Sequence, residues 1–374
     1  MTIPGLDGLR AIAFLLVFAL HTDYLQIGWI GVQFFFVLSG FLITGILLDM
    51  KKALAPREYF FKFYGRRFLR IFPLYYFYLL LMSGVVLWLI SISYRANYMQ
   101  LFLDQVWYAV YYVYDFFFAT VFFEHSLFLD HFWSLSVEEQ FYIFWPLLIL
   151  LIPEKWSKPL FISFIVLALA FRILFYFVYQ SGVFRFFGEP VSLALYPLPF
   201  NHLDAFAFGA YLSRYSIPKA KEQFVALLGL IPTIGFLSQY LATGSIGAIS
   251  ALGYPLQMPE AYQYIWGYTL LNYFFALIIQ VVARQGMFNA FLEKAVMRYL
   301  GKISYGLYVY HFPIIWFSGR VRDLMPTLPE TFAKPMIAAI AFIFTLLAAS
   351  LSYRFLEKPM LNLKDRFFAL RRST

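Results

Sequence analysis

The sequence predicts an all-α fold: a polytopic membrane helical bundle of about ten transmembrane helices, with both termini in the cytoplasm. Three observations lead to this prediction. Of the 374 residues, 62% are hydrophobic and only 13% are charged, which is far from the composition of soluble proteins. Apolar segments long enough to cross a bilayer recur along the whole chain. Lysine and arginine gather in alternate loops, as the positive-inside rule requires.

Ten segments are apolar enough to cross a bilayer, and one of them is short and needs its neighbours to complete the span. They lie at residues 6–25, 28–48, 71–93, 132–152, 159–179, 200–213, 224–241, 263–283, 303–319 and 335–356. Charged residues interrupt the first segment and no small-residue cleavage site follows it, so we expect it to be retained and not removed as a signal peptide. One membrane domain therefore covers residues 1–358, and a short basic cytoplasmic tail follows at 359–374.

An aromatic stretch, residues 105–123, is also long enough to cross. If it does not cross and the N-terminus is cytoplasmic, most basic residues fall inside, and only Arg95, Arg185, Arg320, Arg322 and Lys334 fall outside. If it crosses, the later basic loops fall outside, against the positive-inside rule. We therefore interpret 105–123 as an outer-face or re-entrant element. The same distribution accounts for the formal net charge of +9 without nucleic acid as a partner.

Composition and motifs exclude several kinds of chemistry. The chain has no cysteine, so it forms no disulfide, no thiolate metal site and no cysteinyl intermediate. It contains no Walker-type loop, no dinucleotide-binding glycine motif and no G-x-S-x-G elbow. Soluble nucleotide-binding and serine-hydrolase folds are therefore excluded.

The first segment, GLDGLRAIAFLLVFALH, carries three ionisable residues on one face. On an α-helix, the step from Arg10 to His21 is a turn of about 20° off a common face and a rise of roughly 16 Å. Asp7 precedes Arg10 by three residues, so the two can pair near the cytoplasmic end. Because such a stripe avoids lipid, we expect it to line the bundle interior or a wet cavity, with His21 as a candidate general base. The structural alternative is an anchored helix end and a hydrogen-bonded interhelical histidine.

Three arginines precede the third span, in the sequence YGRRFLRIF. Arg67 and Arg70 are three residues apart, so a helix that begins early presents both guanidinium groups on one face, which suits phosphate binding. Arg66 lies beside them. The alternative is that these residues only mark the cytoplasmic edge of the membrane.

The segment HFWSLSVEEQFYIFWPL brings two carboxylates to the outer end of the fourth span. We expect Glu138 at a depth similar to that of His21, where it can orient the imidazole or accept a proton from it. Glu139 is expected to face solvent. Other acidic residues and histidines crowd the same region, but their spacing includes no histidine pair at i and i+4, so we expect no metal site. They are Glu124, His125, Asp130 and His131.

Further polar residues lie within or beside the spans. His311 is in the middle of the ninth span, where Pro313 is expected to kink the helix, and an interhelical hydrogen bond competes with a functional role. Asn201, His202 and Asp204 lie at the mouth of a short helix. Together with Ser39 of the second span they can line one cavity. The candidate substrate-binding residues are Ser39, Trp133, His131, His311, His202 and Asp204.

Together these stretches resemble the acyltransferase-3 family of integral membrane O-acyltransferases. The matching pieces are GLDGLRAIA, the Arg10 and His21 spacing, GVQFFFVLSGFLI, RRFLRIFPLYY, WSLSVEEQFYIFWPLL, SYGLYVYHFPI and FLEKP. They occur in the expected order from about residue 3 to residue 359.

The resemblance implies transfer of an acyl group, commonly acetyl, from cytoplasmic acyl-CoA to a hydroxyl of a cell-surface carbohydrate or similar acceptor. By this resemblance His21 is the catalytic histidine, Arg10 is its motif partner, and Glu138 matches the motif glutamate. The candidate catalytic residues are His21, Glu138, Arg10 and Asp7, and the candidate residues for binding the CoA phosphates are Arg67, Arg70, Arg66 and Arg10. The expected location is the plasma membrane, the bacterial inner membrane, as a multi-pass protein.

The expected mechanism joins these residues. The anionic head of acetyl-CoA docks on the basic inner face, and its pantetheine arm extends inward so that the thioester reaches His21. His21, oriented by Glu138, deprotonates the acceptor or briefly carries the acyl group. Some relatives carry an extracytoplasmic hydrolase-like domain, for which this chain has no room. We therefore expect transfer to finish in the membrane domain or on an accessory acyl-acceptor protein, and a homo-oligomer is a further possibility.

Three other classes of protein compete with this interpretation. A transporter or flippase of a lipid-linked or carbohydrate substrate explains the intramembrane polar path but not the basic phosphate-like dock. The membrane-bound O-acyltransferase superfamily also uses an intramembrane histidine, but the Arg10 and His21 arrangement near the N-terminus argues against it. A purely structural membrane protein would tolerate loss of His21.

Overall fold

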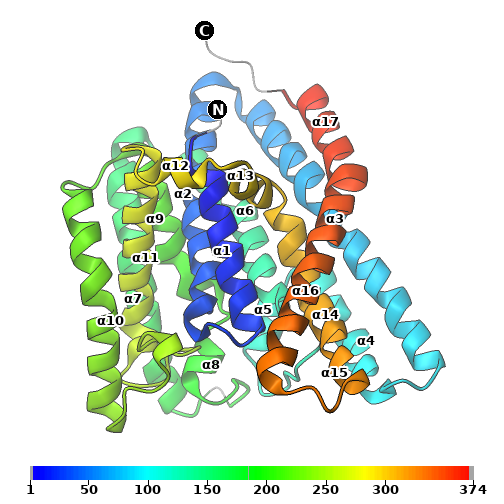
Figure 1. The fold of residues 1–374 in the computed structure, drawn as a ribbon. Coiled ribbons are helices and arrows are strands. Elements are labelled where there is room, and N and C mark those ends of the chain that lie inside the picture. Colours follow the sequence, from blue (N-terminus) through cyan, green and yellow to red (C-terminus); the bar gives the residue numbers. More distant parts are fainter. Residues whose placement is uncertain (1–2, 184, 370–374) are drawn as a thin grey trace. The chain divides into compact units, whose positions relative to one another are not determined.

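The computed structural model describes residues 3–183 and 185–369 (Figure 1). In this part of the chain the regular structure is helical, apart from one isolated β-bridge between Thr120 and Phe187. The predicted all-α class is therefore confirmed. Arg371 and Arg372 of the predicted basic tail lie outside the described residues. The described part of that tail, residues 359–369, is mostly helical, in α17 (Lys358–Phe367).

Each predicted span falls on a helix. The helices are α1 (Leu6–His21), α2 (Ile30–Ala53), α3 (Pro56–Ser91), α6 (Phe132–Leu151), α7 (Ser157–Gln180), α9 (Leu203–Arg214), α10 (Ala220–Thr243), α11 (Gln263–Ala283), α14 (Ser304–Gly319) and α16 (Glu330–Ser352). Seven helical segments of the described chain are long and apolar enough to cross a membrane. Helices α1, α9 and α14 have 16, 12 and 16 residues and fall short of that length. The protein is thus a multi-pass membrane protein, and the number ten stays a prediction.

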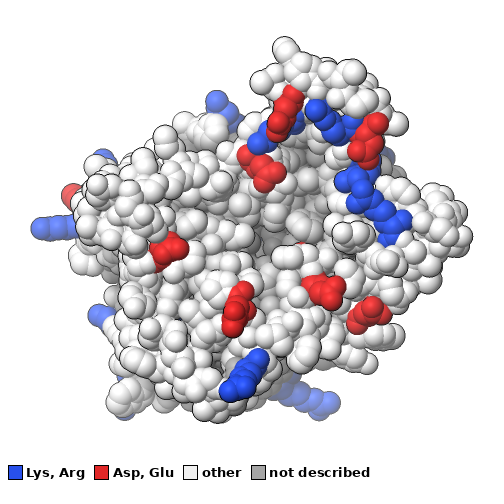
Figure 2. Space-filling view, turned by 90° about the horizontal axis from the view of Figure 1, so that it is seen from below, with Lys and Arg blue, Asp and Glu red and all other residues white. Residues whose placement is uncertain are grey.

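Contacts divide the chain into two compact units. Unit 1 comprises Met1–Asp49, Asp115–Phe123 and Ser134–Gly301, and unit 2 comprises Met50–Tyr114, Glu124–Trp133 and Lys302–Thr374. Figure 2 looks onto one end of the helices, and most of the surface in view there carries no charge.

Within unit 1, glycines allow the start of α1 to seat closely against the chain near α12 (Asn289–Leu292). A Cβ atom at Gly8 would lie 2.6 Å from the carbonyl oxygen of Leu292, and one at Gly301 would lie 1.8 Å from that of Asp7. Because these neighbours are backbone atoms, any side chain at either glycine would force the segments apart. The Gly5 amide also donates to Glu293 Oε1 at 2.5 Å.

Helices α2 and α9 of unit 1 pack backbone to backbone. A Cβ at Gly40 would lie 2.2 Å from the Phe206 carbonyl oxygen, and one at Gly209 would lie 2.0 Å from that of Val37. Small residues that permit such close approach are typical of helix contacts in membranes, where packing replaces the hydrophobic effect.

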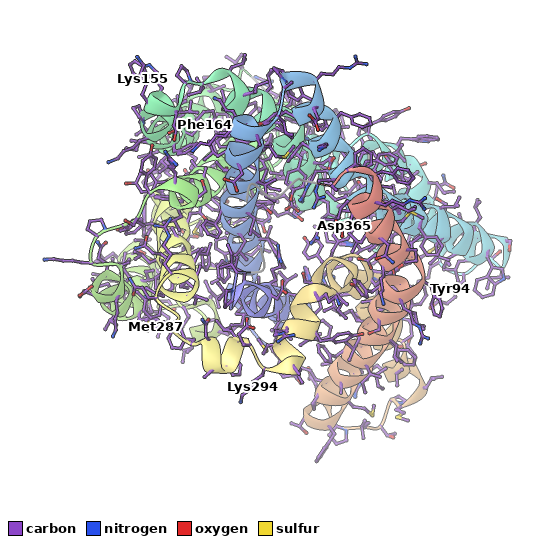
Figure 3. The ribbon with its side chains drawn as sticks, turned by 90° about the horizontal axis from the view of Figure 1, so that it is seen from above. Tyr94, Lys155, Phe164, Met287, Lys294 and Asp365 are labelled. Carbon is purple, nitrogen blue, oxygen red and sulfur yellow. The ribbon has the colours of Figure 1, made fainter. Side chains whose placement is uncertain are left out.

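Side-chain bonds define two opposite ends of unit 1. Arg214, at the end of α9, pairs with Glu154 in the turn between α6 and α7. Gln280, near the end of α11, bonds to Ile217, which precedes α10. The start of α1 lies at this same end, beside α12, and Figure 3 looks onto it with Lys155, Met287 and Lys294 labelled.

The opposite end of unit 1 carries His21. There, Trp29 in the 3-10 turn Gln26–Trp29 donates its indole N–H to the Tyr254 carbonyl at 3.1 Å. Tyr254 belongs to the segment between α10 and α11, and its hydroxyl donates to the Ile231 carbonyl at 3.0 Å. Residues far apart in the sequence therefore close this end.

Unit 2 is built around α3, a helix of 36 residues. At 1.5 Å per residue α3 is roughly 54 Å long, more than the hydrocarbon core requires, so its first turns project beyond the apolar part. α4 (Ala96–Val110) packs on α3, and α14 packs on α16. After α16, a π-helical segment, Tyr353–Glu357, leads into α17, which packs on α3 (Figure 1).

Candidate active site

The polar stripe of α1 has the predicted geometry. The helix runs without interruption from Leu6 to His21, so the rise from Arg10 to His21 is roughly 16 Å. Arg10 Nη1 donates to Asp7 Oδ1 at 2.8 Å, which confirms the predicted pair. His21 is the last residue of the helix and is half-buried. The stripe thus has an ion pair at one end and an imidazole at the other.

Glu138 is the centre of a second polar group in unit 1. The hydroxyls of Ser39, on α2, and Tyr142, one turn further along α6, both donate to Glu138 Oε1. The Ser39 and Tyr142 hydroxyl oxygens lie 3.3 Å apart. The two hydroxyl donors fix the orientation of the carboxylate. Glu139, expected to face solvent, is instead buried, with 7% of its surface exposed.

Helix register corrects the expected depth of Glu138. α2 passes α1 with Gly31 against Ala13 and Val17, and Ser39 lies eight residues further from His21. Two distances along the helix axis add up here: the one from His21 back to the level of Ala13 and Val17 on α1, and the one from Gly31 to Ser39 on α2. At a rise of 1.5 Å per residue, they separate Ser39 and its partner Glu138 from His21 by roughly 20 Å.

The packing of α2 on α11 gives the same register. Phe34 stacks on Phe275 at 4.7 Å between ring centroids, while the α1 residue Gly5 lies beside Val282. Glu138 is therefore level with the Asp7 and Arg10 end of α1, and the prediction that it lies at the depth of His21 and orients it is wrong.

A fully buried ion pair that the sequence analysis missed lies in unit 1. Arg172 of α7 reaches both carboxylate oxygens of Asp204 through Nη2, at 2.8 Å each, and neither side chain is exposed. The guanidinium also donates to Asn201 Oδ1 at 2.7 Å and to Thr269 Oγ1 at 2.8 Å. The arginine within the apolar span LALAFRILF could have indicated this pair, because a charge inside a membrane span usually has a partner.

His202 is equally enclosed. Its Nε2 donates to the Tyr196 carbonyl at 2.8 Å, which leaves Nδ1 to accept from Gln33 Nε2 at 3.0 Å. His202 and Asp204 have no exposed surface. Both are paired with other residues of the protein, and their predicted role in substrate binding stays a prediction.

The arginine-rich turn lies in unit 2, on the first half of α3. Because the helix already begins at Pro56, Arg67 and Arg70 are one turn apart on a helix, as the phosphate-binding prediction requires. Arg67 packs its guanidinium over the Phe63 ring at 6.0 Å. Arg66 has a different partner, since its Nη1 donates to the Phe368 carbonyl, just beyond α17, at 2.9 Å.

Two predicted substrate-binding histidines meet in unit 2. The His131 and His311 rings are 5.4 Å apart between centroids, and both are buried. His131 Nε2 donates to the Val309 carbonyl at 3.1 Å. That carbonyl is available because Pro313, four residues on, has no N–H to offer it. The proline thereby allows His131, which directly precedes α6, to hydrogen-bond to α14, and α14 itself continues to Gly319.

The remaining outer residues include an ordered loop. His125 Nδ1 lies 2.7 Å from Asp130 Oδ2, and the Ser126 amide donates to Asp130 Oδ1 at 2.7 Å. The hydrogen bond to Asp130 raises the pKa of His125. Trp133 is 5% exposed. In the described part of the chain, no three His, Asp or Glu side chains gather as a metal ion would require.

These features define an integral membrane protein with ionisable residues inside its helical bundle, the class in which such residues usually bind substrates or carry out chemistry. The family model described as an acyltransferase domain matches residues 3–354. The chain therefore belongs to the acyltransferase-3 family, which confirms the resemblance and the predicted enzyme class. The match does not support the transporter alternative.

Curated relatives are named O-acetyltransferases. The chain is 28% identical to O-acetyltransferase OatA of Staphylococcus aureus (strain NCTC 8325 / PS 47), over 98% of this chain and 58% of the relative. It is 29% identical to the putative peptidoglycan O-acetyltransferase YrhL of Bacillus subtilis (strain 168), over 99% of this chain and 56% of that protein. It is 28% identical to peptidoglycan O-acetyltransferase OatA of Listeria monocytogenes, over 96% and 56%. The chain thus spans little more than half the length of these relatives. No solved structure matches it.

Proposed function

We propose that this protein is a membrane O-acetyltransferase that moves an acetyl group from cytoplasmic acetyl-CoA to a hydroxyl of a cell-envelope carbohydrate, with peptidoglycan as the first candidate. The acceptor class rests on the names of the relatives. The observation that carries the proposal is the stripe of α1, which places an imidazole roughly 16 Å from an arginine along one uninterrupted helix.

The reaction needs one base and one leaving group. His21 takes the proton of the acceptor hydroxyl, whose oxygen then attacks the thioester carbonyl carbon. The C–S bond breaks, the acetyl ester forms, and the CoA thiolate takes the proton back from the imidazolium. A half-buried imidazole at the end of α1 suits this task, because it is shielded from bulk water and still within reach of substrate.

The donor is expected to enter from the end of unit 1 that carries the start of α1. The loops and helix ends there are basic, with Lys155, Arg214 and Lys294 among them, which favours the cytoplasmic side. Arg67 and Arg70 are proposed to bind the phosphates of CoA, and Arg10 to line the path of the pantetheine arm. Glu138, level with Arg10, is proposed to hold Ser39 and Tyr142 in place beside that path.

The decisive experiment measures transfer of radiolabelled acetyl from acetyl-CoA to peptidoglycan fragments by purified protein in liposomes. His21→Gln should lower turnover by roughly 10²-fold or more, because it removes the general base. His125→Gln is the matched control, since this histidine is exposed on a loop, and it should leave turnover unchanged. Wild-type turnover in a folded His21→Gln protein would refute the proposed role.

A further inference from the structure

The carboxylate of Asp365 links two helices of unit 2 beside the arginine-rich turn. Asp365 Oδ1, on α17, lies 3.5 Å from Arg66 Nη1 and 3.5 Å from Lys364 Nζ. Figure 3 labels Asp365 on α17. One carboxylate oxygen therefore contacts a cation from each of α3 and α17, at the position that a phosphate oxygen would take between them.

The cations are more firmly held than the anion. The side chains of Lys364 and Arg66 are 15% and 22% exposed, whereas that of Asp365 is 66% exposed. An exposed aspartate gains little from such a pair, because water screens it and solvates it when it leaves. Two half-buried cations, in contrast, are costly to leave without an anion. Asp365 can therefore be displaced while its two partners stay in place.

Arg70 is a third cation of this cluster and has the buried Glu357 as an electrostatic neighbour. Arg70 lies one turn from Arg66 on α3, and within the described residues it makes no hydrogen bond and no ion pair. Its electrostatic neighbours are Arg66, Lys364 and the buried Glu357 of the π-helical segment. Arg66, Arg70 and Lys364 thus form a cluster of three cations with two acids, the exposed Asp365 and the buried Glu357.

The seat of α17 on α3 fixes these positions. The Phe368 ring packs directly on Gly65. A Cβ atom added at residue 65 would lie only 2.2 Å from Phe368 Cε1, so this contact requires glycine there. The same ring packs on Phe61 at 5.2 Å between centroids. Arg66 Nη1 holds the Phe368 carbonyl, which leaves its other N–H groups for a ligand.

We propose that Lys364 and Arg66 form a binding pair for a phosphate group and that Asp365 takes the place of this phosphate until an anionic ligand displaces it. The inference rests on the proposed function, because the ligand it names is the phosphate of the acyl donor. Lys364 is thereby a donor-binding residue outside the arginine motif.

The test measures the Kd of CoA for the purified full-length chain in uncharged detergent, with pantetheine, which has no phosphate, as the reference ligand. Lys364→Gln should weaken CoA binding roughly three- to tenfold, as expected for a lost charged hydrogen bond. Asp365→Asn should strengthen it about two- to fivefold, because the competing carboxylate charge is gone. Neither variant should change the affinity for pantetheine.

Two controls separate binding from folding. Arg366→Gln, with the same charge change on the exposed neighbouring position of α17, should leave the Kd of CoA unchanged. Lys364→Arg keeps the charge and should retain affinity. If Asp365 only clamps α17, Asp365→Asn will lower thermal stability and will not tighten CoA binding, and the proposal fails.

The outcomes also distinguish this inference from the proposed function. Absence of CoA binding to the wild-type protein would refute the proposed function itself. CoA binding that Lys364→Gln and Asp365→Asn both leave unchanged would refute only the inference. Nanodiscs with and without an anionic phospholipid form a second arm: if the two variants alter lipid binding and not CoA binding, the phosphate that this pair holds is that of a lipid headgroup.

Discussion

Arg172 shows what a single buried charge does in this protein. Its guanidinium has no exposed surface and is saturated by Asp204, Asn201 and Thr269. Thr269 lies on the part of α11 that is level with His21, so the network braces the end of unit 1 that carries the candidate base. We expect this ion pair to act mainly by holding the helices in place, because the attraction within a buried pair is offset by a desolvation cost of similar size.

Replacing Arg172 by methionine should therefore destabilise the protein strongly. Removing one partner of a buried pair costs about 3–5 kcal/mol, because the remaining carboxylate is left uncompensated. Thermal unfolding in detergent measures the effect, and Arg172→Met/Asp204→Asn should recover part of the loss. Arg214→Met is the control: its pair with Glu154 is exposed and should cost about 1 kcal/mol or less. Equal losses in the two single variants would contradict this account.

The histidines differ in how far the sequence could assign them. The spacing in α1 placed His21 correctly relative to Arg10, because a single uninterrupted helix fixes both. The contact between His131 and His311 depends on how α14 packs in unit 2, and no local pattern contains it. Likewise, nothing in the sequence could show that Pro313 frees a carbonyl for His131.

Among the helices, α2 and α9 depend most on glycine. Gly209→Ala should destabilise by about 1–3 kcal/mol, because the Val37 carbonyl and the Phe41 amide that the new methyl group meets are backbone atoms and cannot rotate away. Gly229→Ala on α10 is the matched control, since nothing lies within 4 Å of its added Cβ. It should stabilise by about 0.5–1 kcal/mol through helix propensity. Melting temperatures in one detergent compare the two, and a neutral Gly209→Ala would show that the helices separate freely.

The predicted depth of Glu138 was wrong because of an offset between helices. Counting residues from predicted helix ends put Glu138 and His21 at one depth, which assumes that all ends lie in one plane. In unit 1 they do not, since α6 is offset along α2 and brings Glu138 level with Arg10. Side-chain contacts such as Ser39 to Glu138 set this offset, and sequence spacing within one helix carries no information about it.

For the whole chain, the proposed orientation can be tested by labelling, because the sequence has no cysteine. Lys155→Cys and Lys294→Cys lie at the end of unit 1 where α1 starts, and both should react with a membrane-impermeant maleimide only from the cytoplasmic side (Figure 3). Ser245→Cys, in the exposed turn after α10, should react only from outside. Labelling of all three from one side would refute the orientation.

The sequence by itself determined the helical membrane class, the positions of the main helices, the Asp7 and Arg10 pair and the family. These follow from composition, from periodicity within one helix and from motifs in order, all of which are local in the chain. Only the tertiary structure decided that Arg172 pairs with Asp204, that Glu138 is level with Arg10, and that α17 brings Lys364 to Arg66. Each of these depends on the offset between two helices, which is set by side-chain packing across helices far apart in the sequence.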